Sequence, residues 1–205
     1  VPVWGFAAPG TIVTVTFAGQ RVEAIADESG RWTATLSPMP ASYESRALTI
    51  ESAGIETRTI HDVLVGDVYL LAGQSNMSWP LRAGRDDKVL AEANHPWLRV
   101  FMQADGRGAA DQRSDDVRWG KWKLCTPESA GAISGVGYHF ALSLHEHVDV
   151  PIALVHTAVG GTKIECWIDR PTLETIPTIA PYLEAVAKAE ARHAEDAAKH
   201  QVRIA

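Results

Sequence analysis

Residues 65–77 limit what this chain can fold into more than any other segment. Residues 68–71, Val-Tyr-Leu-Leu, form an apolar run of the kind typical of a parallel strand buried on both faces. The run stops at Gly73, and Gln-Ser-Asn follows in a tight turn. In an open α/β sheet, ligands bind at the carboxyl ends of the strands. The segment therefore predicts such a sheet, with the hydroxyl of Ser75 at its binding edge.

Two interpretations of Ser75 follow from its position alone. A hydroxyl just beyond the end of a buried strand suits a catalytic nucleophile. Serine is also a favoured N-cap residue, so Ser75 can instead serve to begin the next helix. Because serines between a strand and a helix are common, the position alone favours the capping role.

Residues 1–62 have a different pattern, in which apolar and polar side chains alternate with a period of two. Short alternating runs separated by glycine-containing turns are typical of a small β-sandwich. We therefore expect a sandwich-like accessory module over residues 1–62. Its predicted strands are residues 11–17, 21–26, 31–36, 48–50 and 57–60.

From residue 63 onward the pattern becomes strand, turn and helix. Buried strands are predicted at residues 98–102 and 151–156, and a helix is predicted to begin at Ser134 and bury Val136, Phe140 and Leu144 on one face. The second of these strands also ends in a glycine turn, at residues 158–162. A doubly wound domain normally needs about five parallel strands. With three in view, residues 63–205 are predicted to form an incomplete doubly wound α/β domain that ends in a helical tail.

The predicted connection over residues 103–130 is too long for an ordinary loop, and such loops are often functional. Trp119 and Trp122 lie in it. Tryptophan in a loop can stack on a sugar ring or anchor the loop to the core, and we favour the anchoring role.

Composition excludes several classes of partner. The 205 residues carry a formal net charge of −6 without a basic block, so nucleic acid is not an expected partner. No apolar run is long enough to span a bilayer, and no membrane partner is expected. The two cysteines, Cys125 and Cys166, could form one disulfide or remain two free thiols, and the sequence favours neither alternative. The histidines match no zinc pattern, so neither a metal nor a cofactor is expected.

The segment Gly-Gln-Ser-Asn-Met at residues 73–77 resembles the nucleophile block of the SGNH hydrolase superfamily, and more closely that of the sialate O-acetylesterase family of carbohydrate esterases. It differs from the Gly-x-Ser-x-Gly elbow of α/β-hydrolases, because Met77 replaces the second glycine. Residues 62–68, 134–141 and 160–167 fit the same family. The resemblance extends into the N-terminal module and spans nearly the whole chain.

The resemblance implies a serine esterase that removes O-acetyl groups from carbohydrates, either sialic acid or acetylated plant polysaccharide, without metal or cofactor. Ser75 would be the nucleophile, and its own backbone N–H would contribute to the oxyanion hole. Glu165 and Trp167 would pack behind the site. The residues expected to line the site or to hold the turn in shape are Gly160, Gly161, Thr162, Gln74 and Asn76.

One expected part of the site is missing from the sequence. Members of the family carry, further along, an Asp-x-x-His-like block that supplies the general base, and these 205 residues contain no such block. A serine needs a base within hydrogen-bond reach. His95, on a predicted loop, His139 and His156 have no aspartate partner at a recognisable spacing, so none of them is expected to serve.

We therefore expect the chain to be the N-terminal portion of a longer esterase, inactive until a continuation or a separate chain supplies Asp and His. The alternative is a non-catalytic carbohydrate-binding or structural fragment, in which the sandwich-like module of residues 1–62 is the functional part. Family members are commonly exported, so an extracellular or periplasmic location is expected.

Overall fold

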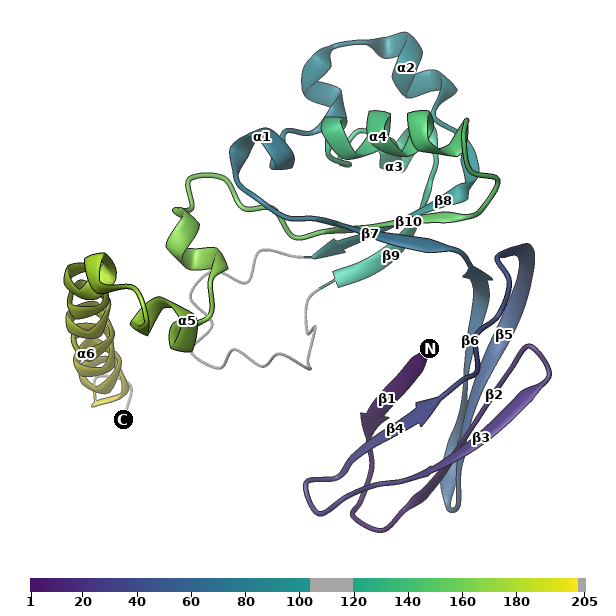
Figure 1. Ribbon diagram of the computed structural model, residues 1–205, viewed down its shortest axis with the longest axis horizontal. Helices are drawn as coiled ribbons and strands as arrows, with labels where there is room; N and C mark the ends of the chain where they lie inside the picture. Colours follow the sequence, from purple (N-terminus) through teal and green to yellow (C-terminus); the bar gives the residue numbers. More distant parts are fainter. Residues whose placement is uncertain (104–119, 203–205) are drawn as a thin grey trace. The chain divides into compact units, whose positions relative to one another are not determined.

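The computed structural model describes residues 1–103 and 120–202 (Figure 1). The chain divides into two compact units, Val1–Val159 and Gly160–Ala205. The first unit contains both the N-terminal strands and the α/β sheet that carries Ser75. The predicted domain boundary at residue 62 stays a prediction, and strand β6 continues across it to Val65.

The N-terminal strands, here called the β module, form two antiparallel sheets. Strands β1 and β4 pair with each other, and the other four strands pair in the order β3-β2-β5-β6. Val15 of the larger sheet and Trp32 of the smaller sheet are buried in one shared core, as expected for a sandwich. The strands are β1 (Pro2–Phe6), β2 (Ile12–Phe17), β3 (Gln20–Ile25), β4 (Arg31–Thr35), β5 (Ser42–Ser52) and β6 (Ile55–Val65).

A mixed sheet of order β7-β10-β8-β9 follows the β module. Strands β7, β10 and β8 are parallel, which confirms the three predicted strands. The prediction that the first of them is buried on both faces was wrong, because Val68 and Leu70 of β7 are exposed. Strand β9 is antiparallel to β8 and lies where we predicted a loop, so that prediction was wrong for residues 120–125. The strands are β7 (Asp67–Leu71), β8 (His95–Gln103), β9 (Gly120–Cys125) and β10 (Ile152–His156).

Short helices cover one face of this sheet within the first unit (Figure 1). They are α1 (Ser75–Ser78), η1 (Leu81–Gly84), α2 (Asp87–Glu92), α3 (Pro127–Ala130) and α4 (Gly135–His145). Alternate strand residues such as Leu98 and Leu154 are fully buried beneath them. Val68 and Leu70, which point to the opposite face, are largely exposed. The doubly wound arrangement, with helices on both faces, therefore stays a prediction.

Helix α4 packs on the sheet through a face that differs from the predicted one. Its buried residues are Gly137, Tyr138 and Ala141, whereas Val136 and Phe140 are exposed. A side-chain β-carbon at position 137 would lie only 2.3 Å from a methyl carbon of Leu71. The helix therefore approaches β7 too closely for a larger residue, and small residues form the buried face.

The second unit contains η2 (Ile164–Trp167), α5 (Arg170–Glu174), η3 (Pro177–Ile179) and the long helix α6 (Ala180–Val202), in agreement with the predicted helical tail. Both cysteines are free thiols, with Cys125 buried and Cys166 exposed. Among the described residues, no helix has the length and apolar character needed to cross a membrane.

Candidate active site

The turn after β7 places Ser75 at the carboxyl edge of the parallel strands. Gly73 has a φ of +139°, in the region that side-chain-bearing residues rarely adopt. Gln74 is the N-cap residue of α1, and Ser75 is the first residue within that helix. The interpretation of Ser75 as a helix cap is therefore wrong. As the first helical residue, Ser75 has a backbone N–H that no intrahelical carbonyl accepts.

The Ser75 side chain is exposed, and its hydroxyl donates a hydrogen bond to Gln74 Oε1 over 2.9 Å. The backbone of the turn is also closed, because Ser78 N–H donates to the Gln74 carbonyl over 3.0 Å. Within the described residues, Ser75 makes no hydrogen bond to a histidine or a carboxylate. The turn therefore holds an exposed hydroxyl in place, and the role of Ser75 as a nucleophile stays a prediction.

The end of β10 runs alongside the start of this turn. Thr157 N–H donates to the Leu71 carbonyl over 3.1 Å, and Val159 N–H donates to the Gly73 carbonyl over 2.9 Å. On the other side, the buried hydroxyl of Ser134, the N-cap residue of α4, donates to Met77 Sδ over 3.7 Å and accepts a hydrogen bond from Gly137 N–H in the first turn of that helix. Strand β10 and helix α4 therefore hold the turn at residues 73–78, here called the nucleophile turn after its candidate nucleophile Ser75, from two directions.

The predicted lining residues Gly160, Gly161 and Thr162 belong to the second unit, so their role beside Ser75 stays a prediction. Gly161 has a φ of +80°, which suits a tight turn. Trp167 Nε1–H donates to Thr162 Oγ1 over 2.9 Å and so fixes the position of this hydroxyl within its own unit. Glu165 and Trp167 form part of the short helix η2.

Within the described residues, none of the three histidines considered as bases is hydrogen-bonded to Ser75, and whether one of them could serve as the base stays untested. His95 begins β8 rather than lying on a loop, and its Nε2 is 2.9 Å from the Tyr138 hydroxyl. Burial, with a smaller effect from the charge of His145, lowers the pKa of His95. His156 is buried at the end of β10, and burial lowers its pKa too. His139 is exposed on α4, with its ring edge against Tyr138.

A groove of about 660 Å³ lies directly beside the nucleophile turn. Asn76, the residue after Ser75, lines it, and so does the exposed Trp79, which is the C-cap residue of α1. Our sequence reasoning missed this groove. The available signal was a tryptophan within four residues of the candidate nucleophile, but its exposure depends on the tertiary structure. The lining residues are Asn76, Trp79, Pro80, Leu81, Gly84, Gly135, Val136 and His139.

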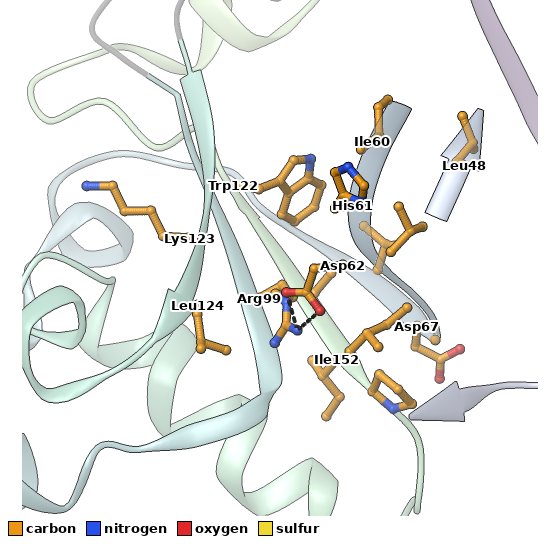
Figure 2. Close-up of a pocket in the computed structure, with 16 residues that line it drawn as sticks. Leu48, Ile60, His61, Asp62, Asp67, Arg99, Trp122, Lys123, Leu124 and Ile152 are labelled. Atoms are coloured by element: carbon orange, nitrogen blue, oxygen red, sulfur yellow. Dashed lines mark hydrogen bonds and ion pairs between the residues drawn. The ribbon is translucent and has the colours of Figure 1, made fainter. Parts of the chain in front are cut away.

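A second cavity, of about 500 Å³, lies between the β module and the amino ends of β7 and β10 (Figure 2). Asp62 accepts two hydrogen bonds from Arg99 Nη2 there, at 3.1 and 2.9 Å. Trp122 also lines this cavity and contacts Phe101 edge-on, with ring centroids 5.3 Å apart. Trp119 lies outside the described residues. Ligands of parallel sheets bind at the carboxyl ends of the strands, whereas this cavity lies at the amino ends. We therefore interpret it as part of the packing interface between the β module and the sheet, and not as a ligand site.

Among the described residues, no cluster of three or more His, Cys, Asp or Glu side chains could hold a metal ion. The site presents an exposed hydroxyl, held on a closed turn beside a partly apolar groove.

Comparison with known proteins gives a consistent result. Residues 65–203 match the family model described as carbohydrate esterase, sialic acid-specific acetylesterase. The chain is 31% identical over 194 residues to the sialate O-acetylesterase of Mus musculus, covering 84% of this chain and 35% of that protein. For the sialate O-acetylesterase of Homo sapiens, the identity is 33% over 185 residues, with 80% and 34% covered.

A solved structure is also similar. The crystal structure of a carbohydrate acetylesterase from Xanthomonas citri matches with a TM-score of 0.78 and 36% sequence identity. The match covers 84% of this chain and 39% of that one. The chain thus spans about a third of the length of the curated relatives that it matches.

Proposed function

This chain belongs to the sialic acid-specific acetylesterase family of carbohydrate esterases, and on that premise we propose that it removes O-acetyl groups from carbohydrates with Ser75 as the nucleophile. The observation that carries the proposal is the position of the Ser75 hydroxyl. It is exposed at the carboxyl edge of a parallel strand, on a turn that hydrogen bonds close. Ligands of open α/β sheets bind at this edge.

The chemistry of ester cleavage assigns a part to each group on the turn. Ser75 Oγ attacks the acetyl carbonyl carbon, and the carbonyl oxygen becomes a tetrahedral oxyanion. The Ser75 backbone N–H at the start of α1 is proposed to donate to that oxyanion, and each such donor is worth about 3–4 kcal/mol in the transition state. The sugar hydroxyl leaves with a proton, and water then releases acetate from the acetyl-serine.

A base must take the proton of Ser75, and Gln74 cannot do so, because a neutral amide oxygen binds protons too weakly at neutral pH. We propose that an Asp–His pair from a segment outside these 205 residues supplies this base. That segment would be either a continuation of the same chain or a separate chain. Alone, these residues would then have little esterase activity.

The remaining site residues have supporting roles in this proposal. Gln74 holds the Ser75 hydroxyl through the 2.9 Å hydrogen bond, and Asn76 lines the groove. Gly160, Gly161 and Thr162 follow Val159, whose N–H is bonded to Gly73. We propose that their backbone approaches the substrate closely, which glycine permits.

The alternative function is a non-catalytic carbohydrate-binding or structural fragment. The observation in its favour is that, within the described residues, Ser75 contacts no group that could act as its base. The coding sequence beyond the codon for Ala205 discriminates between the two functions. An in-frame Asp-x-x-His block supports the esterase, and a stop codon at that point favours the fragment.

The activity itself is tested with the product of the complete reading frame, by measuring acetate release from O-acetylated sugars. We expect Ser75→Ala to reduce the rate at least about a thousandfold, since loss of a catalytic serine removes covalent catalysis. The variant Ser78→Ala is the matched control, because Ser78 belongs to the same short helix and its hydroxyl donates to the Ser75 carbonyl, a backbone group, over 3.2 Å. A comparable loss in both variants would contradict the assignment.

A further inference from the structure

The groove beside Ser75 has an exposed aromatic wall on a rigid backbone. The side chain of Trp79 is 61% exposed although its backbone is firmly held. The Trp79 carbonyl accepts from Gly135 N–H over 2.8 Å, and Leu81 N–H donates to the Ile133 carbonyl over 2.8 Å. Pro80, between them, forms a bridge with Ser134. The exposed indole ring is therefore carried on a backbone that is already ordered, so no backbone ordering is needed when a ligand binds.

Helix α4 forms the opposite wall. Val136 and His139 are one helical turn apart, so both face the groove, and both are exposed. An apolar wall with a few polar groups is typical of a small-molecule site, and the volume of about 660 Å³ is in the range of such sites. An acetyl group alone is far too small to fill it. The groove is continuous with the nucleophile turn through Asn76.

The charge of the groove distinguishes between classes of sugar. None of the described residues that line it is a lysine, arginine, aspartate or glutamate. A sugar carboxylate is bound best by arginine, whose guanidinium matches it with two hydrogen bonds. The adjacent Arg82 directs its Nη1 to the Gly131 carbonyl at 3.3 Å. The apolar C–H face of a neutral pyranose, by contrast, matches an exposed indole ring.

We propose that this groove binds the neutral pyranose ring of the O-acetylated substrate, with Trp79 as the stacking surface, and that it does not select the carboxylate of sialic acid. The inference rests on the proposed function, because it assigns the groove to the sugar whose ester Ser75 attacks. It makes Trp79 a determinant of specificity.

Binding without turnover tests the inference. The 205-residue chain carrying Ser75→Ala, which cannot consume the probe, is titrated by ligand-observed NMR with methyl 2-O-acetyl-β-xylopyranoside. A parallel titration uses the methyl glycoside of 9-O-acetyl-N-acetylneuraminic acid. We expect the neutral xyloside to bind more tightly. We expect Trp79→Ala to weaken its binding by roughly tenfold, and Trp79→Phe to recover most of the loss.

Trp122→Ala is the matched control, because Trp122 is 54% exposed but lies on β9 and lines the other cavity. We expect it to leave the Kd unchanged within about twofold. Tighter binding of the sialoside, equal losses in both tryptophan variants, or no binding of the xyloside would each overturn the inference. A xyloside that binds through Trp79, but is not deacetylated by the complete protein, would refute the proposed function and leave the groove assignment standing.

Discussion

The Ser75 hydroxyl donates a hydrogen bond to Gln74 Oε1, 2.9 Å away on the preceding residue. This hydrogen bond orients the oxygen but cannot activate it, because an amide oxygen does not accept a proton at neutral pH. The two residues together place a hydroxyl at the edge of the sheet and do not activate it. Our central proposal is that Ser75 is a positioned nucleophile and that a group outside the 205 residues supplies its base.

The conformation of Gly73 is predicted to be essential for this placement. With a φ of +139°, Gly73→Ala should cost about 1–3 kcal/mol of folding free energy, since alanine is strained there. Chemical denaturation measures the change. Gly84→Ala is the matched control, because a β-carbon at position 84 meets no atom within 4 Å. We expect the free energy of unfolding of the Gly84→Ala variant to change by less than about 1 kcal/mol. Equal effects of the two substitutions would contradict the argument.

The ion pair between Asp62 and Arg99 is predicted to stabilise the attachment of the β module to the α/β sheet. The Arg99 side chain is only 17% exposed, whereas that of Asp62 is 57% exposed. Asp62→Asn removes the charge but keeps a residue that tolerates the φ of +57° found there. We expect a loss of about 1 kcal/mol in the free energy of unfolding, reduced from the value for a buried pair by solvent screening.

Arg21 and Glu51 provide the comparison for this pair. Their side chains are exposed, with Arg21 Nη1 3.2 Å from Glu51 Oε2. Glu51→Gln should therefore cost less than about 0.5 kcal/mol by the same denaturation measurement. If this loss equals or exceeds that of Asp62→Asn, the Asp62–Arg99 pair has no special role in stability.

Stability is predicted to fall with acid because of His156. This side chain is 8% exposed, its Nε2 has no partner within the described residues, and burial lowers its pKa below the usual 6.5. The unfolded state therefore binds a proton more readily. The contribution of neutral His156 to the free energy of unfolding is complete above about pH 6.5 and is lost as the pH falls below that value. Denaturation between pH 8 and pH 5 should show a smaller decrease in His156→Leu than in the wild type. Parallel curves would contradict this prediction.

Some of this fold could be predicted from the sequence. The parallel strands β7, β8 and β10 were recognisable because buried strands are short apolar runs bounded by turns. Strand β9 was missed, although Lys121-Trp122-Lys123-Leu124 alternates with a period of two. The long polar segment before it led us to predict a loop. Strand β1 was missed because Pro2 and Gly5 disfavour strands, and an edge position tolerates both.

The site was predictable in part for a similar physical reason. The position of Ser75 follows from the strand and the turn, and both are local features. The buried face of α4 was not predictable from its apolar periodicity, because the close approach of Gly137 to Leu71 decides it. The groove at Trp79 depends on how three backbone segments pair, and no single segment contains that information.

Hydrolysis of p-nitrophenyl acetate by the 205-residue chain tests the central claim most directly. The rate is measured for the wild type and for Ser75→Ala at equal concentration. Because the claim places the base outside these residues, we predict that the two rates agree within about twofold and stay close to the uncatalysed rate. Appreciable turnover by the wild type that disappears in Ser75→Ala would contradict it, because the base would then lie within this chain.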